Sequence, residues 1–200
     1  MFLSQITMPY GPKSTQFDRD VYQSHQMITL GVRKAASMPV RFRVEPTKDD
    51  LKVLVLSHSK PDWTDVFQDD TTWLTKDFEI NPSVGDLFQF RLRANTVTCK
   101  TDKKGHHTYA PVFRAPDLVE WISNRAERCG FAIESLDAPL NEGRKSGFRR
   151  GEQLTFQSAL FGGLVRVTDV KIFLESVYSG IGRSKGFGFG LFSVIPVDLS

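Results

Sequence analysis

The stretch from Gly180 to Gly190 reads Gly-Ile-Gly-Arg-Ser-Lys-Gly-Phe-Gly-Phe-Gly and combines five glycines with two basic and two aromatic side chains. Glycine has no Cβ, so such a backbone can approach a ligand closely and expose its N–H groups. Arg183 and Lys185 supply positive charge for phosphate oxygens. We expect a helix over residues 168–179 before this glycine loop and a buried strand over residues 187–197 after it.

The predicted order of helix, glycine loop and strand excludes two common phosphate-binding loops. A Walker A loop places Lys-Ser or Lys-Thr after its last glycine and then opens a helix, and a dinucleotide-binding loop leads from a strand into a helix. The order predicted here is the reverse. Two interpretations stay open, a loop that binds an anion and an ordinary exposed loop with solubilising charges.

Positive charge in this chain is local rather than global. The 200 residues carry a formal net charge of only +3, and 40% of them are hydrophobic, which suits one large domain or two small ones. Between residues 143 and 185, however, eight Lys and Arg residues stand against three acidic ones. Acidic residues gather instead at 49–50 and over 62–79. This asymmetry favours a protein with one face for an anion such as nucleic acid.

The sequence predicts no cofactor, metal or membrane segment. Cys99 and Cys129 form no CxxC motif and indicate neither a metal site nor a disulfide framework. His106 and His107 have no convincing ligand partners at metal-binding spacing, so a basic loop that touches an RNA backbone is the better interpretation of residues 100–107. We find no signal peptide and no apolar run of about eighteen residues, and therefore expect a cytoplasmic protein.

Hydrophobic periodicity and capping residues predict the helices and strands. The expected helices span residues 19–34 with Asp18 as N-cap, 117–129 with Gly130 after its end, and 168–179 with Asp169 as N-cap. The expected strands span residues 2–7, 40–45, 51–57, 86–97, 131–136, 153–167 and 187–197, with a bulge at Gly162–Gly163. Residues 60–80 should hold at most one short helix, and residues 141–151 should form the tip of a basic hairpin.

These elements predict an α+β fold made of two ferredoxin-like (RRM-like) βαββαβ domains in tandem, with the glycine-rich loop near the C-terminus. We place the domain boundary after Asn95, which gives domains of residues 1–95 and 96–200. The second half is also βαββαβ if the strand at 86–97 is shared between the two domains or counted with the second. The usual aromatic stacking signature of RNA-recognition motifs is not evident, and a fold alone gives no function.

Three motifs together resemble the CasE family of the RAMP superfamily, the CRISPR repeat-processing endoribonucleases of the type I-E Cascade complex. The motifs are Asp20-Val-Tyr-Gln-Ser-His25, Phe90-Arg-Leu-Arg-Ala-Asn95, and Gly162-Gly-Leu-Val-Arg-Val-Thr-Asp169 leading into the glycine loop. The resemblance spans nearly the whole chain, and the glycine loop is its most specific part.

The resemblance implies metal-independent cleavage of a repeat hairpin in the CRISPR precursor RNA. The 2′-hydroxyl of the substrate attacks the adjacent phosphate and leaves a 2′,3′-cyclic phosphate and a 5′-hydroxyl. The resemblance also implies that the guide RNA product stays bound and that the other Cascade subunits are partners.

Tyr22 and His25 are the candidate catalytic residues. They stand at positions i and i+3, so they share one face of the first helix. Histidine can transfer protons in either direction near neutral pH, and Tyr22 can orient it or share the proton transfer, so the two roles stay unassigned. Arg33 and Lys34, further along the helix, are candidates to neutralise the phosphate. A structural role in helix packing is the alternative for both Tyr22 and His25.

Basic and glycine residues elsewhere are candidates for RNA binding. The hairpin tip, residues 144–150 (Arg-Lys-Ser-Gly-Phe-Arg-Arg), is the best candidate for gripping a stem, because a thin basic hairpin can enter beside a loop or a helix end. An ordinary exposed turn is its alternative. The expected RNA-binding residues are Arg33, Lys34, Arg91, Arg93, Lys100, Lys103, Lys104, Arg144, Lys145, Arg149, Arg150, Gly182, Arg183, Lys185, Gly186 and Gly188.

Two other functions compete with the endoribonuclease. One is a non-catalytic RAMP-type RNA-binding subunit of a CRISPR effector complex, which would give no reason for Tyr22 and His25 to share a site. The other is a general RRM-like RNA-binding protein, which the glycine loop disfavours.

Overall fold

The computed structural model describes residues 1–32, 40–67, 70–101 and 104–197. The chain forms two compact units, each assembled from separate stretches of sequence. The first unit contains Met1–Asn81, Lys145–Thr155 and Arg183–Leu191, and the second contains Pro82–Arg144, Phe156–Gly182 and Phe192–Ser200. A single domain boundary after Asn95 is a different division of the chain, and it stays a prediction.

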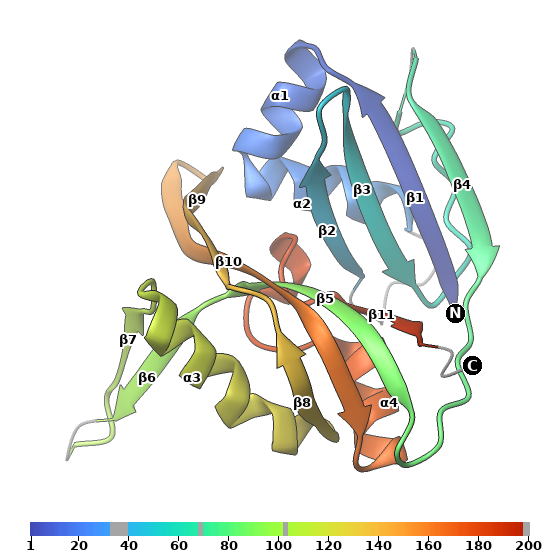
Figure 1. The fold of residues 1–200 in the computed structure, drawn as a ribbon. Helices are drawn as coiled ribbons and strands as arrows, with labels where there is room; N and C mark the ends of the chain where they lie inside the picture. Colours follow the sequence, from blue (N-terminus) through green and yellow to red (C-terminus); the bar gives the residue numbers. More distant parts are fainter. Residues whose placement is uncertain (33–39, 68–69, 102–103, 198–200) are drawn as a thin grey trace. The chain divides into compact units, whose positions relative to one another are not determined.

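The first unit is a four-stranded antiparallel sheet with two helices (Figure 1). Its elements are β1 (Phe2–Pro9), α1 (Pro12–Arg19), α2 (Val21–Gly31), β2 (Arg41–Pro46), β3 (Asp50–Ser57) and β4 (Thr72–Asp77). The strand order is β2-β3-β1-β4, so β2 lies at one edge. Val53 of β3 pairs with Ile6 on one side and Val44 on the other, so all three side chains point to the same face of the sheet.

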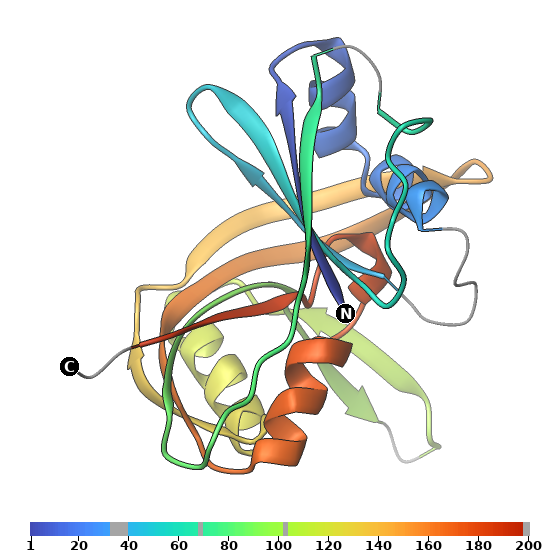
Figure 2. The same cartoon turned by 90° about the vertical axis from the view of Figure 1, so that its right-hand side faces the viewer.

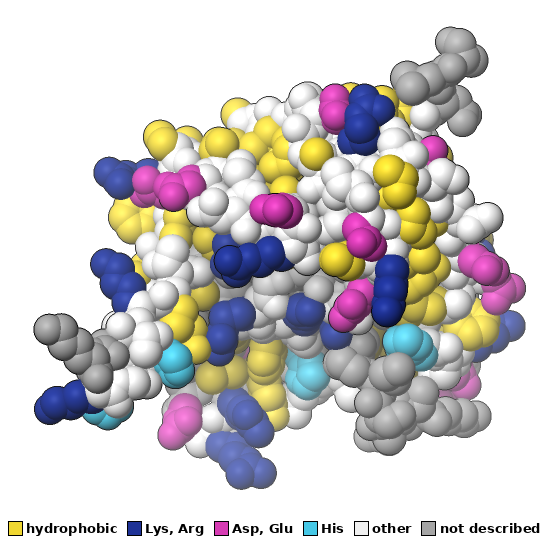
Figure 3. Space-filling model, turned by 90° about the horizontal axis from the view of Figure 1, so that it is seen from below, with side chains coloured by type: hydrophobic (Ala, Val, Ile, Leu, Met, Phe, Trp, Pro, Cys, Tyr) yellow, Lys and Arg dark blue, Asp and Glu magenta, His cyan; other side chains and the backbone are white. Residues whose placement is uncertain are grey.

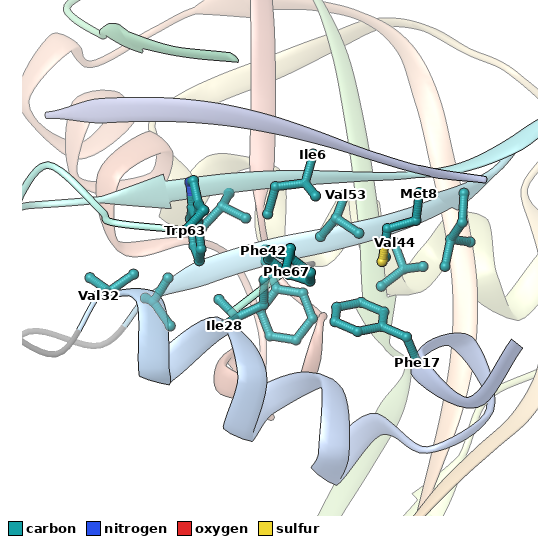
Figure 4. Packing of buried hydrophobic residues seen from close by; sticks show 13 residues of the cluster. Ile6, Met8, Phe17, Ile28, Val32, Phe42, Val44, Val53, Trp63 and Phe67 are labelled. Atoms are coloured by element: carbon teal, nitrogen blue, oxygen red, sulfur yellow. The ribbon is translucent and has the colours of Figure 1, made fainter. Parts of the chain in front are cut away.

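That face is covered by the helices and forms the core of the first unit (Figure 4). Phe17 of α1 and Ile28 of α2 are almost fully buried there, together with Phe42 of β2. The ring of Phe17 lies 6.3 Å from that of Phe67, which in turn lies 5.8 Å from the ring of Trp63. The core therefore fixes the position of α2, the helix that carries Tyr22 and His25.

The prediction of one helix over residues 19–34 with Asp18 as N-cap is wrong. The chain forms two helices, and Asp20 is the N-cap of the second: its carboxylate accepts hydrogen bonds from the backbone N–H groups of Tyr22 (2.9 Å) and Gln23 (3.1 Å). Pro12 at the first position of α1 was the sequence signal for the extra helix. Helix α2 ends at Gly31, where any Cβ would overlap the ring of Trp63.

The acidic stretch over residues 60–80 contains a strand that the sequence did not reveal. β4 pairs with β1, and five of its six residues are exposed. Trp73 and Leu74 are 39% and 69% exposed, so β4 lacks the alternation of buried and exposed side chains that marks a strand in sequence.

The second unit contains a larger antiparallel sheet and a small two-stranded one. Its elements are β5 (Leu87–Asn95), β6 (Val97–Thr101), β7 (His107–Pro111), α3 (Ala115–Ala126), the 3-10 turn η1 (Glu127–Cys129), β8 (Phe131–Leu136), the first half of β9 (Leu140–Arg149), most of β10 (Glu152–Val167), α4 (Val170–Ser179) and β11 (Phe192–Pro196). The order in the larger sheet is β11-β5-β10-β8, and β9 pairs with β10. The tip of the β9–β10 hairpin, residues 145–155, belongs to the first unit.

Phenylalanines fill the core of the second unit. Phe173 of α4 packs on Phe88 of β5 at 5.3 Å, and Trp121 of α3 stacks on Phe161 of β10 at 5.6 Å between ring centroids. Phe161 is paired with Leu92, which shares its face of β5 with Phe88, so both helices cover the same face of the sheet. Figure 2 shows α3 and α4 together on that side.

Several local predictions for the second unit are confirmed. Gly130 follows η1 with a φ of 76°, and the Asp169 carboxylate accepts a hydrogen bond from the Ile172 N–H at 2.9 Å as the N-cap of α4. The expected bulge at Gly162–Gly163 is not confirmed. These two residues pair with Arg91 and Phe90 in continuous register, and the shift between β10 and β8 falls between Leu164 and Val165, where the extra residue is Glu134 of β8.

The basic loop expected over residues 100–107 lies at the β6–β7 hairpin, where Lys100 and Thr101 pair with Thr108 and His107. One other prediction is wrong. The last strand begins at Phe192 and not at Phe187, because residues 185–187 form a 3-10 turn, η2 (Lys185–Phe187).

The architecture is thus α+β with antiparallel sheets, as expected. No helix within the described residues is long and apolar enough to span a membrane. Lys and Arg side chains are interspersed with Asp and Glu on the face drawn in Figure 3, which agrees with the small net charge of +3.

Candidate active site

The site is built on α2. Ile28 points into the core, and Tyr22 and His25 are half-buried on the same helix. The Ser24 hydroxyl donates to the carbonyl oxygens of Phe17 and Asp20 and thereby ties α2 to the end of α1. The two candidate catalytic side chains therefore stand on a helix that is capped, packed and bonded to its neighbour.

The glycine loop approaches His25 from a distant part of the sequence. The Nδ1 atom of His25 lies 2.7 Å from the carbonyl oxygen of Gly186, a residue of η2. A carbonyl oxygen only accepts hydrogen bonds, so Nδ1 carries the proton and donates it. In the neutral imidazole, Nε2 then keeps its lone pair, which makes Nε2 the atom that can take up a proton.

An aromatic side chain of the loop completes the site. The ring of Phe187 lies 5.1 Å from that of His25 and 6.4 Å from that of Tyr22, and the Tyr22 and His25 rings are 6.2 Å apart. These contacts hold the imidazole between a hydrogen bond on one side and an aromatic ring on the other. The sequence reading missed Phe187 because it assigned this residue to a strand, although a Phe between two glycines of a basic loop was a usable signal.

Glycine is needed where the loop turns towards the sheet. Gly188 has a φ of 84°, in the left-handed region, and a Cβ there would lie 3.1 Å from the ring of Phe42. At Gly186 a Cβ would meet only the imidazole of His25, at 3.4 Å, which is ordinary contact. Gly188 therefore shapes the loop, and Gly186 contributes its carbonyl group.

Two buried arginines of edge strand β2 lie on the face opposite the core, and the sequence reading did not single them out. One guanidinium N–H of Arg43 donates to the Leu191 carbonyl at 3.1 Å, and another donates to Glu45 at 2.5 Å. This places Arg43 as an anchor for the end of the glycine loop. Burial lowers the pKa of Arg41. The alternation Arg-Phe-Arg-Val in β2 was the available signal, because Phe42 and Val44 fill the core and leave the arginines on the other face.

Of the expected RNA-binding residues, two basic ones lie on the glycine loop within the first unit. Arg183 is exposed, and Lys185 is half-buried in η2. Gly182 belongs to the second unit. Arg33, Lys34 and Lys103 lie outside the described residues.

The basic hairpin tip is attached to the junction of α1 and α2. Lys145 forms an ion pair with Asp18 at 3.2 Å, and Ser146 makes a β-bridge with Asp20. Gly147 is buried, and a Cβ there would lie 2.7 Å from the backbone nitrogen of Tyr22. Arg149 and Arg150 are exposed beyond this attachment. The structure thus brings the tip of the predicted hairpin against the start of the helix that carries Tyr22 and His25.

The remaining candidates lie in the second unit. Arg91 on β5, Lys100 and Lys104 in the β6–β7 hairpin, and Arg144 on β9 are exposed. Arg93 is only 6% exposed, and its guanidinium donates two hydrogen bonds to the Glu142 carboxylate, at 2.7 and 2.5 Å. The Ser158 hydroxyl donates to the same carboxylate at 2.7 Å. This geometry gives Arg93 a structural partner inside its own unit.

Potential metal ligands do not cluster within the part of the chain that the structure describes: no group of three or more His, Cys, Asp or Glu side chains could hold an ion. His107 instead lies in the small hairpin, with Nδ1 at 2.9 Å from the Thr101 hydroxyl. The chemistry available at α2 is therefore proton transfer by an oriented imidazole and a phenol beside a basic loop.

Solved structures share this α+β fold. A structure of the CRISPR endoribonuclease Cse3 bound to a 19-nucleotide RNA superposes with a TM-score of 0.84 at 25% identity, covering 98% of this chain and 100% of the other. The CRISPR-associated protein Cas6e from Escherichia coli K-12 superposes with a TM-score of 0.73 at 27% identity and the same coverage. The fold thus places the chain in the same structural class as these CRISPR proteins.

The sequence belongs to the family of CRISPR associated proteins, which it matches over residues 1–196. Two curated relatives are each 27% identical over 98% of this chain and their own full length. They are the CRISPR system Cascade subunit CasE of Escherichia coli and the CRISPR-associated endoribonuclease Cse3 of Thermus thermophilus. The resemblance to the CasE family is confirmed, and the chain is a homologue of these endoribonucleases.

Proposed function

We propose that this protein is a metal-independent endoribonuclease that cleaves CRISPR precursor RNA at repeat hairpins and keeps the guide RNA in a Cascade-type complex. The observation that carries the proposal is the hydrogen bond from His25 Nδ1 to the Gly186 carbonyl, in a chain homologous over its whole length to CasE and Cse3. This bond fixes the tautomer in which Nε2 of the neutral imidazole keeps its lone pair, and it holds the half-buried ring beside a basic loop.

The proposed reaction uses protons that the chain itself can hold. Nε2 of neutral His25 takes the proton from the 2′-hydroxyl while the 2′-oxygen forms a bond to the adjacent phosphorus. The bond from phosphorus to the 5′-oxygen breaks, and a proton supplied by the Tyr22 hydroxyl or by protonated His25 converts that oxygen into a hydroxyl. The products are a 2′,3′-cyclic phosphate and a 5′-hydroxyl, and the assignment of acid and base between the two residues stays open.

Phosphate charge in this proposal is met by the basic residues of the glycine loop. Arg183 and Lys185 belong to the same segment as the Gly186 carbonyl that orients His25. Their positive charges would therefore stabilise the negative charge of a phosphate near Nε2. Arg149 and Arg150 grip the stem from the hairpin tip. Binding by the other expected residues, except Arg93 with its buried partner Glu142, is part of the same proposal.

Both units are proposed variants of the ferredoxin-like fold. In each, the first strand of the sheet lies between the last and the third, as in the orders β2-β3-β1-β4 and β11-β5-β10-β8. The first unit lacks a helix between β3 and β4 within its described residues, so it is an incomplete βαββαβ repeat.

The test is cleavage of the repeat RNA in excess EDTA, beside a substrate with a single 2′-deoxy nucleotide at the cut. The proposal expects cleavage of the first RNA only, with a cyclic phosphate on the upstream product. Tight binding of both RNAs without cleavage would leave a non-catalytic RNA-binding subunit, and cleavage of the deoxy substrate would contradict attack by the 2′-hydroxyl.

A further inference from the structure

A groove in the first unit lies between α1 and the hairpin tip. Its volume is about 670 Å³, within the usual range of roughly 300–1,000 Å³ for small-molecule pockets. Its walls come from α1 with the following residue, and from β9 of the tip. The lining residues are Pro12, Thr15, Gln16, Arg19, Asp20, Ser146, Gly147 and Phe148.

The two walls of the groove are joined at its base. The Lys145–Asp18 ion pair and the bridge between Asp20 and Ser146 attach the tip to α1 and to the start of α2. Gly147 allows the closest approach, because any side chain would overlap the Asp20 carboxylate and the Tyr22 nitrogen. These contacts hold the groove open before any ligand arrives, which reduces the ordering cost of binding.

The groove combines a flat apolar surface with a cation and polar groups. Phe148 is 57% exposed, and it stands directly before Arg149 and Arg150 at the end of β9. On the opposite wall Arg19 is exposed, and it has no carboxylate partner among the described residues. Gln16 and Thr15 add an amide and a hydroxyl. The Asp20 carboxylate is occupied as the cap of α2.

We propose that this groove binds one unpaired nucleobase of the substrate RNA, stacked on Phe148 with its edge or its phosphate facing Arg19. The inference rests on the proposed function, since it takes the ligand to be the same RNA. An aromatic ring stacks only on a base whose face is uncovered, so the ligand is a base outside the continuous stem. The site would recognise a nucleotide that base pairing in the hairpin does not fix.

The test measures binding of an uncleavable repeat hairpin that carries a 2′-deoxy nucleotide at the cut and its natural unpaired nucleotides. Each unpaired base is replaced by an abasic residue in turn, and each RNA is titrated against the wild type and Phe148→Ala. Phe148→Tyr keeps the ring. Phe113→Ala is the matched control, because Phe113 is 54% exposed and lies outside the groove.

Phe148→Ala should weaken binding of the intact RNA by about 5- to 150-fold, the range of roughly 1–3 kcal/mol for one base stacked on an aromatic ring. One of the abasic RNAs should bind the wild type as weakly as the intact RNA binds Phe148→Ala. With that abasic RNA, Phe148→Ala should cause no further loss of affinity. Phe148→Tyr and Phe113→Ala should bind like the wild type. The melting temperature of Phe148→Ala should stay unchanged because the side chain is exposed.

Unchanged affinity of Phe148→Ala, or losses that simply add at every abasic position, would overturn the inference and leave the groove for a protein partner. Cleavage of the all-ribose RNA by the wild type is followed separately. If the wild type cleaves this RNA but the effects of Phe148→Ala and of every abasic residue are independent, only this inference fails. If the two effects depend on each other but no cleavage occurs, only the endoribonuclease proposal fails.

Discussion

The Nδ1 atom of His25 lies 2.7 Å from the carbonyl oxygen of Gly186, across 161 residues of sequence. The contact joins a helix near the N-terminus to a loop near the C-terminus within one compact unit. It selects the imidazole nitrogen that faces the substrate in the proposed reaction. The conformation of the glycine loop is therefore part of the chemistry and not only of RNA binding.

Gly188→Ala should destabilise the protein by about 1–2 kcal/mol, because an L-residue is strained in the left-handed region and its Cβ would press on Phe42. Gly186→Ala is the matched control, since its Cβ meets ordinary contact only. Urea denaturation of both variants measures the difference. Equal stability of the two would show that the loop does not depend on the conformation at Gly188.

Gly147→Ala should slow cleavage more than it weakens binding. The new Cβ would displace the Asp20 carboxylate and the Tyr22 nitrogen, which shifts the start of α2. A misplacement of about 1 Å can cost roughly 100-fold in rate. Single-turnover rates and the Kd of the deoxy RNA measure the two effects separately.

Gly11→Ala serves as the control for Gly147→Ala, because nothing lies within 4 Å of a Cβ at Gly11. If the rate and the affinity of Gly147→Ala fall by the same factor, the hairpin tip does not position the catalytic helix.

Replacing both Arg149 and Arg150 by Ala should weaken RNA binding and flatten its salt dependence. Each lost phosphate contact reduces the slope of log K against log salt by about 1. The cleavage rate of the saturated complex should stay nearly the same. Lys48→Ala, at an exposed turn between β2 and β3, is the control. A double variant with an unchanged salt slope would contradict the stem-gripping role of the tip.

Arg93→Met should lower the free energy of unfolding by about 3–5 kcal/mol, because it leaves the Glu142 carboxylate without its buried partner. Arg91→Ala, two residues away on the exposed face of β5, should change stability little. Thermal unfolding of both variants and RNA titration of Arg93→Met decide between a structural and an RNA-binding role for Arg93. A stable Arg93→Met that binds RNA poorly would restore Arg93 as an RNA ligand.

Local signals predicted much of this fold. Asp169 and Gly130 occupy the cap positions that their chemistry favours, and the alternation in β3 reflects one buried face. The break between α1 and α2 was not predictable in this way, since Asp18 and Asp20 are equally good caps and the choice depends on packing. β4 could not be predicted because its exposed side chains show no periodic hydrophobic pattern.

The candidate site was predictable only in part. Tyr22 and His25 could be placed on one helix face from their spacing. The partners of His25, the Gly186 carbonyl and the Phe187 ring, lie more than 160 residues away in the sequence. Residue spacing predicts contacts only between neighbours in the sequence, so it could not predict these. The burial of Arg93 depends on Glu142 of β9, which is equally beyond the reach of local patterns.

The central claim is that His25 transfers a proton in the cleavage step. The most direct test is the single-turnover cleavage rate of His25→Ala beside its affinity for the deoxy RNA. We predict a rate loss of about 100- to 10,000-fold, typical of a lost general acid or base, with the affinity nearly unchanged. An unchanged cleavage rate, or equal losses of rate and affinity, would contradict it.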